Sequence, residues 1–332
     1  MLHVAMISKW HVHAKDYAQQ LLQRSDKVQI TCLWDEDEAR GRAWAEELGV
    51  DFEQNYDTLL ARSDVDGVVI DTATAVHHEI IIKAAKAKKH IFTEKVLAPT
   101  VRECVEIAQA IQENDVAFCI SYPQLQTPAF RYAKQLVDDG TLGTISSMRV
   151  RNGHDGAIAN WLPQYWYHRK DACGGVMLDL GCHPMYLVRW ILGAPKSVNS
   201  NFSYLTNREV EDSATCTIAF ENGAVAITES SFVAPASPYI MEVYGDKGTI
   251  IVIDNEVTVM LKKDRELIKQ TPAQLPEPPL AAIDQWIEAC ETGSQPVECG
   301  LEEAIHLTEL MEAAYIAETE NRTVSISELK RS

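Results

Sequence analysis

The chain has 332 residues, 46% of them apolar, which is too long for one ordinary core and suits two domains. Its 30 basic and 48 acidic residues leave a formal net charge of -18, which argues against nucleic acid or an anionic membrane as a partner. The eight cysteines include no C-x-x-C pair, and no apolar run is long enough to span a bilayer. With no signal-peptide pattern either, these features favour a cytoplasmic protein with reduced thiols.

The first part of the chain alternates short apolar runs with segments of helical periodicity. This alternation predicts an α/β fold over residues 1–124, built on a doubly wound (Rossmann) parallel sheet that binds a dinucleotide. The expected strands cover 2–7, 28–34, 67–70, 90–93 and 116–121, and the expected helices cover 14–23, 39–48, 79–88 and 101–113. Ligands of such sheets bind at the carboxyl ends of the strands. The residues at these ends are Ser8, Asp35, Thr72, Glu94 and Tyr122.

The cofactor preference depends on Asp35, which ends the second expected strand. In a dinucleotide fold, an acid at this place bonds the adenosine ribose hydroxyls and favours NAD over NADP. The acids at 36–38 would repel the additional phosphate of NADP, although acids are also ordinary residues for a helix start. No arginine is expected beside Asp35 to receive that phosphate. We therefore expect NAD, with NADP less favoured.

The loop after the first strand departs from a dinucleotide fingerprint, which has glycines at its first, third and sixth positions. Ser8, Trp10 and His13 hold those positions here. A serine still permits a turn, whereas Trp10 would obstruct the close approach of a pyrophosphate. The cofactor therefore binds with a displaced pyrophosphate, binds weakly or does not bind. His11 and His13 lack the spacing of helical metal ligands, as do the adjacent residues His77 and His78, and without a Cys or acid to complete a set we expect no metal.

Beyond about residue 125, sequential strands are joined by short turns. Hairpin signals at 221–223 and 245–248 predict an α+β domain over 125–332 with a largely antiparallel open sheet. The expected strands cover 145–150, 197–205, 214–220, 224–231, 240–244, 249–253 and 257–262, and the expected helices 128–139, 280–292 and 301–321. A sheet with one face free of its own helices commonly pairs with a second copy, so we expect a homodimer or homotetramer.

The stretch 174–193 carries the chemical signal of this second domain. It opens with a glycine pair, and Asp179 and His183 follow four residues apart, so a helix places both on one face. A carboxylate one turn from an imidazole orients the ring and raises its basicity, which suits a general acid or base. Considered alone, His183 is better explained as a hydrogen-bonded structural histidine.

Two motifs together resemble the Gfo/Idh/MocA family over nearly the whole chain: Glu94-Lys95 after the fourth expected strand, and G-G-x(3)-D-x-G-x-H at 174–183. Members of that family bind NAD or NADP and oxidise a secondary hydroxyl of a sugar, cyclitol or related polyol, or run the reverse reduction. The resemblance implies that the two segments meet beside a nicotinamide. It makes Lys95, Asp179 and His183 the catalytic residues, with His183 moving the proton, Asp179 holding its other nitrogen and Lys95 polarising the hydroxyl.

The same resemblance covers two further site residues, and the others are those of the strand ends, the first loop and the aromatic segment. Thr72 and His77 match the family pattern T-P-x-x-x-H, with Ala73 in place of the proline. The expected cofactor-binding residues are Ser8, Trp10, His11, Asp35, Thr72, His77, Glu94 and Lys95. The expected substrate residues are Tyr122, Trp161, Trp166, His168 and Tyr186. The aromatic residues of 161–168 are equally explained as a satellite core or a subunit contact, and Arg169 is better explained as an ordinary surface residue than as a carboxylate partner.

The chain departs from the family pattern at three places. These are the glycine-free loop, Val96 where proline is usual, and Tyr186 where a further acid is usual, which removes a polar substrate contact. Two other functions remain open on this fold. One is a sugar- or nucleotide-sensing binding protein without turnover, and the other is an enzyme that uses tightly held NAD for transient oxidation during elimination or glycoside cleavage.

Overall fold

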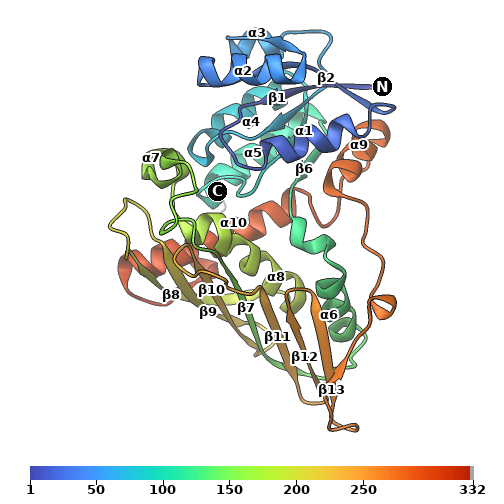
Figure 1. The fold of residues 1–332 in the computed structure, drawn as a ribbon, viewed down its shortest axis with the longest axis vertical. Coiled ribbons are helices and arrows are strands. Elements are labelled where there is room, and N and C mark those ends of the chain that lie inside the picture. Colours follow the sequence, from blue (N-terminus) through green and yellow to red (C-terminus); the bar gives the residue numbers. More distant parts are fainter. Residues whose placement is uncertain (330–332) are drawn as a thin grey trace. The chain divides into compact units, whose positions relative to one another are not determined.

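A computed structural model describes residues 1–329, which fall into two compact units (Figure 1). Among the described residues, 1–121 and Leu280–Ile305 form the first unit, and Tyr122–Pro279 and 306–329 form the second. The expected boundary after residue 124 is therefore displaced by a few residues. The segment 280–305, which we expected in the second domain, belongs to the first unit.

The first unit contains the expected doubly wound parallel sheet, with the strand order β3-β2-β1-β4-β5-β6. All of its strand pairs are parallel. The strands are β1 (Leu2–Ile7), β2 (Val28–Trp34), β3 (Asp51–Phe52), β4 (Gly67–Ile70), β5 (His90–Thr93) and β6 (Phe118–Ile120). The order reverses between β1 and β4, so the loops at their carboxyl ends border the usual ligand-binding crevice.

Three helices of this unit, α2, α3 and α5, begin at side-chain caps. Asp37 accepts a hydrogen bond from the Arg40 N–H at the start of α2, and Thr100 and Glu103 form a capping box on α5. The helices are α1 (Ala14–Leu22), α2 (Glu38–Leu48), α3 (Tyr56–Leu60), α4 (His77–Lys86), α5 (Val101–Asn114) and α9 (Ala282–Thr292). Helix α9 joins this unit because the buried Trp286 ring packs against Phe92 of β5, with ring centroids 5.8 Å apart.

The second unit contains a mostly antiparallel sheet with the order β14-β13-β12-β11-β7-β10-β9-β8-β15. The β7–β10 pair is parallel, and the other pairs are antiparallel. The strands are β7 (Ile145–Gly153), β8 (Pro195–Ser203), β9 (Ser213–Phe220), β10 (Val225–Ser231), β11 (Ile240–Gly245), β12 (Gly248–Ile253), β13 (Glu256–Leu261), β14 (Ile268–Lys269) and β15 (Val324–Ser325).

One face of this sheet forms the core of the second unit. In β9, Ala214, Cys216, Ile218 and Phe220 alternate inward, and the nearly all-apolar helix α8 is packed close to β7 and β10. The helices are α6 (Pro128–Asp138), α7 (Arg169–Ala172), a π-helix (Met177–Gly181), α8 (Cys182–Leu192) and the part of α10 (Leu301–Glu320) from His306. Short 3₁₀ turns cover Thr74–Val76, Pro123–Gln126, Gln164–Tyr167, Pro272–Gln274 and Ile326–Glu328. Among residues 1–329, no helix is both long and apolar enough to cross a membrane.

Candidate functional site

The loop after β1 makes a tight turn without glycine. Ser8 has a φ of 71°, in the left-handed region that glycine ordinarily occupies, and its side-chain oxygen accepts the Trp10 N–H at 3.0 Å. The His11 N–H donates to the Asp71 carbonyl at 2.9 Å, which ties this loop to the end of β4. The Trp10 side chain is buried. The turn of a dinucleotide loop is thus present, with a large side chain at its third position.

Each oxygen of the Asp35 carboxylate already accepts two hydrogen bonds. Its Oδ2 accepts the Lys9 N–H and Arg40 Nε, both at 2.9 Å, and its Oδ1 accepts the Asp37 N–H at 2.8 Å and an Arg40 guanidinium nitrogen at 2.6 Å. The expectation that no arginine stands beside Asp35 is therefore wrong. Arg40 lies in the first turn of α2, and the helix start brings its guanidinium back to the end of β2.

His77 connects the loops that follow β4 and β5. Its Nε2 lies 3.1 Å from the Thr72 carbonyl oxygen, and its Nδ1 lies 3.0 Å from the Val96 carbonyl oxygen. Burial lowers the pKa of this imidazole, so the ring is neutral at physiological pH. A neutral ring has one N–H and can donate to only one of these two oxygens, so His77 is a buried contact of both loops beside Lys95. Thr72 Oγ1, which we expected at the cofactor, is buried and has no hydrogen-bond partner among residues 1–329.

A buried polar cluster lies at the end of β5. The Tyr17 hydroxyl donates to Glu94 Oε2, while His13 Nδ1 lies 3.3 Å and His11 Nε2 3.9 Å from Glu94 Oε1. Lys95 Nζ is 3.9 Å from the same oxygen. The structure thus supplies the acid that the sequence did not show beside these histidines. The signal for Tyr17 was its position four residues after His13, the N-cap of α1.

In the second unit, the glycine pair of the central motif is explained by close packing. A Cβ on Gly174 would lie 1.9 Å from the Tyr315 hydroxyl oxygen, and one on Gly175 would lie 2.1 Å from the Glu211 carbonyl oxygen. Glu211 Oε1 also accepts the N–H groups of Gly175 (2.8 Å) and Met177 (3.1 Å) and the Tyr315 hydroxyl (2.7 Å). Glu211, which our sequence reasoning missed, therefore fixes the start of the π-helix that carries Asp179.

Glu211 makes the stability of this segment depend on pH. Burial raises the pKa of its carboxyl above the ordinary 4.5, so the folded state holds the proton more strongly than the unfolded chain. The resulting stabilisation is present below pH 4.5 and is lost as the pH rises through the folded-state pKa. Gln cannot ionise. Between pH 4.5 and the folded-state pKa of Glu211, the free energy of unfolding of Glu211→Gln should therefore rise relative to that of wild type, by up to about 1.4 kcal/mol per pH unit.

Urea unfolding at a series of pH values tests this prediction, with Glu211→Ala as the comparison. Alanine removes the acceptor of three donors and, like glutamine, cannot ionise, so we expect Glu211→Ala to be about 1–3 kcal/mol less stable than Glu211→Gln at every pH. A constant difference between Glu211→Gln and wild type across the pH series would contradict the assigned titration.

The motif histidine is held by a tyrosine. His183 is buried, and its Nδ1 lies 2.8 Å from the Tyr186 hydroxyl oxygen, which accepts the Gln124 N–H at 3.1 Å. The Tyr122 ring packs on Tyr186, with centroids 4.6 Å apart. We expected Asp179 to hold a nitrogen of this ring and Tyr186 to mark a lost polar contact. The Tyr186 hydroxyl is itself a polar contact of the histidine, and the role of Asp179 stays a prediction.

The expected substrate residues divide into buried and exposed groups. Tyr122, Trp166 and Tyr186 are buried, and Trp166 Nε1 donates to Asp179 Oδ2 at 3.4 Å. Trp161 is 54% exposed and donates to Asp155, and the His168 side chain is 46% exposed. Trp166 is therefore the member of the aromatic loop that contacts a motif residue. The Arg169 guanidinium bonds the Glu209 carbonyl oxygen, as an ordinary surface arginine does.

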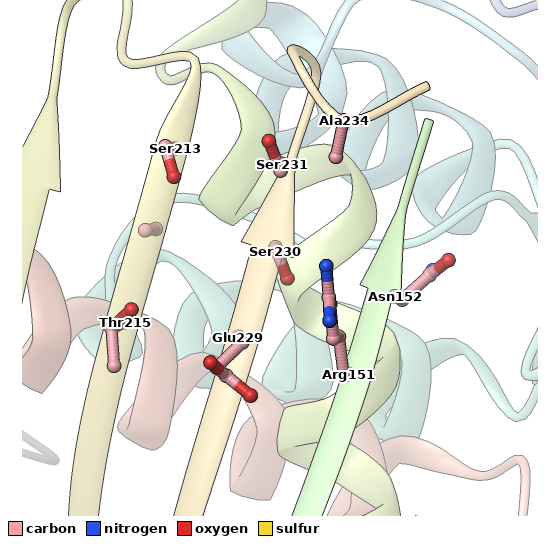
Figure 2. A pocket seen from close by; sticks show the side chains of 9 residues that line it. Arg151, Asn152, Ser213, Thr215, Glu229, Ser230, Ser231 and Ala234 are labelled. Carbon is pink, nitrogen blue, oxygen red and sulfur yellow. The ribbon is translucent and has the colours of Figure 1, made fainter. Parts of the chain in front are cut away.

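A polar hollow with a cavity volume of about 250 Å³ lies on the second unit where β7, β9 and β10 run side by side (Figure 2). Arg151 of β7 lies over Glu229 and Ser230 of β10, and Ser213 and Thr215 of β9 line the opposite side. Arg149, two residues before Arg151, forms an ion pair with Glu229 at 2.6 Å. None of the residues expected from the sequence lines this hollow.

Two family models match the chain. One is described as an oxidoreductase family with an NAD-binding Rossmann fold and matches residues 4–122. The other is described as a GFO/IDH/MocA C-terminal domain and matches residues 130–251. Together these matches span most of both units.

Individual proteins agree with these matches. The scyllo-inositol 2-dehydrogenase (NAD(+)) of Bacillus subtilis is 26% identical over 305 residues, which covers 88% of this chain and 87% of that protein. The myo-inositol 2-dehydrogenase of Thermotoga maritima is 28% identical over 265 residues, covering 76% of this chain and 75% of that protein. The solved structure of levoglucosan dehydrogenase with NADH and levoglucosan has a TM-score of 0.86 at 20% identity, covers 98% and 99% of the two chains, and shows the shared fold.

Proposed function

The chain belongs to the Gfo/Idh/MocA family of oxidoreductases, and from this premise we propose that it transfers a hydride between a nicotinamide cofactor and a secondary hydroxyl of a sugar, cyclitol or related polyol. The observation that carries the proposal is the match of both family models, one to each unit. The names of the inositol dehydrogenase relatives support the choice of a polyol.

The residues of the first unit fit NAD. The left-handed Ser8 reproduces the glycine turn of a dinucleotide loop, and Asp35 stands at the end of β2, where an acid meets the adenosine ribose. The residues that would border the cofactor are Ser8, Trp10, His11, Asp35, Thr72, His77, Glu94 and Lys95. When bound, the nicotinamide accepts or returns the hydride.

The proton chemistry belongs to the second unit. His183 would take the proton of the substrate hydroxyl during oxidation and return it during reduction. The Tyr186 hydroxyl has two lone pairs and receives one Gln124 N–H, so it can either accept from His183 Nδ1 or donate to it. This contact supports His183 in both protonation states. Lys95 of the first unit would stabilise the charge that develops on the substrate oxygen.

Calorimetric titration with NAD, NADH and NADP tests the cofactor, and NADH formation on a panel of polyols tests the reaction. We expect micromolar binding of NAD and hydride transfer from at least one cyclitol or sugar. A protein that binds no nicotinamide would refute the dehydrogenase function and favour a sensor. NADH that accumulates in proportion to the substrate consumed would identify simple dehydrogenation, and substrate conversion without net NADH would favour transient oxidation.

Arg40 should control the choice between the two cofactors. Its guanidinium occupies the Asp35 oxygens that a ribose diol uses, and it is also a bidentate binder of phosphate. We therefore expect Arg40→Ala to weaken NADP binding by at least about tenfold and to change NAD affinity by less than about threefold, or to improve it. Calorimetry on both cofactors measures the two affinities. An equal loss for both would mean that Arg40 only supports the loop.

The exposed face of the sheet in the second unit supports self-association. Apolar side chains emerge there from β10, β12 and β13, with Val225 and Ile227 each 40% exposed, Ile253 45% and Met260 36%. A face with this many exposed apolar side chains is typical of a protein interface. We infer that two copies pair through this face to give a homodimer or homotetramer. Light scattering that reports a monomer at micromolar concentration would contradict this.

A further inference from the structure

Three side chains of the first unit bring metal-binding atoms together at the carboxyl ends of β1 and β5. One ligand atom from each of His11, His13 and Glu94 lies within 4.8 Å of the other two. The residues come from two loops that are far apart in sequence. We propose that His11, His13 and Glu94 bind one divalent transition-metal ion with the preferences of zinc.

The distances are close to those of a zinc site. Bonds of about 2.0–2.2 Å around a tetrahedral ion separate the ligand atoms by roughly 3.3–3.5 Å. The distance from His13 Nδ1 to Glu94 Oε1 is 3.3 Å, and that from His11 Nε2 to the same oxygen is 3.9 Å. Two imidazoles and one carboxylate are a zinc donor set that leaves a fourth position for water or a ligand oxygen.

The surroundings of Glu94 match those of a ligating carboxylate. The buried Tyr17 hydroxyl donates to Oε2, which leaves Oε1 facing the two histidines. Partners in this outer position orient metal-binding carboxylates in known sites. The contact therefore prepares Glu94 to bind through one oxygen.

A second buried carboxylate gives independent support. Both oxygens of Asp71 are buried without a hydrogen-bond partner among residues 1–329, and the Asp71 side chain is close enough to Glu94 for their charges to interact. The His11 N–H bonds the Asp71 carbonyl, so the two residues are held next to each other. Buried carboxylates are costly unless they are paired or bind a cation. A divalent ion at Glu94 would offset the charges of both acids.

Two contacts compete with the ion. Lys95 Nζ lies 3.9 Å from Glu94 Oε1, and the His13 N–H lies 3.3 Å from His11 Nδ1. Coordination through His11 Nε2 places the ring proton on Nδ1, so the second contact has to open. It is a long hydrogen bond and correspondingly weak. A divalent ion would offer Glu94 Oε1 a larger counter-charge than the single ammonium group of Lys95 does.

The test uses the full-length chain without an affinity tag. The protein is stripped with a chelator and then titrated with Co²⁺, followed by visible absorption, and with Zn²⁺, followed by calorimetry. We expect one equivalent of each ion to bind, with the intense visible bands of four-coordinate cobalt. His13→Ala should weaken binding by at least about 100-fold, and Tyr17→Phe by about 10- to 100-fold.

His78→Ala is the matched control, because His78 is a surface histidine of the same unit whose Nε2 lies 2.7 Å from Glu106. It should bind both ions like wild type. The His13 side chain is 37% exposed, so its removal leaves the core intact, and circular dichroism of the metal-free variants verifies their fold. A stripped wild-type protein that takes up no stoichiometric ion, or a His13→Ala variant that binds like His78→Ala, would overturn the proposal.

Discussion

Replacement of His183 by alanine is expected to lower the turnover number by about 100- to 10,000-fold, the usual contribution of a positioned acid or base. The physical reason is the loss of the only imidazole in the central motif, whose Nδ1 is held by Tyr186. Turnover is measured as NADH formation at saturating polyol and NAD. The cofactor domain is untouched, so NAD affinity should stay within about threefold of wild type.

Tyr186→Phe separates orientation from proton transfer. This variant keeps the aromatic contact with Tyr122 and removes only the hydroxyl at His183 Nδ1. We expect an intermediate loss of about tenfold, with a shifted pH profile of turnover, because one hydrogen bond to the ring is worth roughly 1–1.5 kcal/mol.

Undiminished turnover of His183→Ala would exclude the histidine as the acid or base.

Lys95→Met is expected to lower turnover by about 100- to 1,000-fold, the range for loss of one donor to a developing oxyanion. Methionine keeps an unbranched apolar stem in a buried position and removes the ammonium group that lies 3.9 Å from Glu94. The charge on the substrate oxygen then develops without a counter-charge. Turnover at saturating NAD isolates this effect from any weakening of cofactor binding.

Lys88→Met serves as the control for Lys95→Met, because Lys88 is an exposed lysine of the same unit, just after α4. Its turnover should equal that of wild type. If both variants were equally active, the role of Lys95 would be limited to its contact with Glu94.

Most of the fold follows from local patterns in the chain. The Rossmann strands are short apolar runs with polar residues at their ends, and the antiparallel strands alternate buried and exposed residues between hairpin turns. The two-residue strand β3 was missed because so short a segment has no periodicity. The parallel β7–β10 pair and the return of α9 were missed because both depend on contacts between distant segments.

The candidate site was predictable only where a single stretch carries the motif. Asp179 and His183 stand in one pattern, whereas Arg40 meets Asp35 through the geometry of a helix start. Glu211 and Tyr315 reach the glycine pair from separate elements, and Glu94 reaches the loop histidines from another strand. Residues that act across such distances in the chain leave no local signal, because tertiary packing alone brings them together.

The route of the chain also sets rules for building chimeras of this protein. The polypeptide passes from one unit to the other at 121/122, 279/280 and 305/306, so neither unit is a single contiguous module. A cofactor half excised as residues 1–124 would lack Trp286, which packs on Phe92 and covers Gly67. Grafting a different substrate-binding half onto this scaffold therefore needs three matched junctions, and α9 has to stay with the cofactor-binding half.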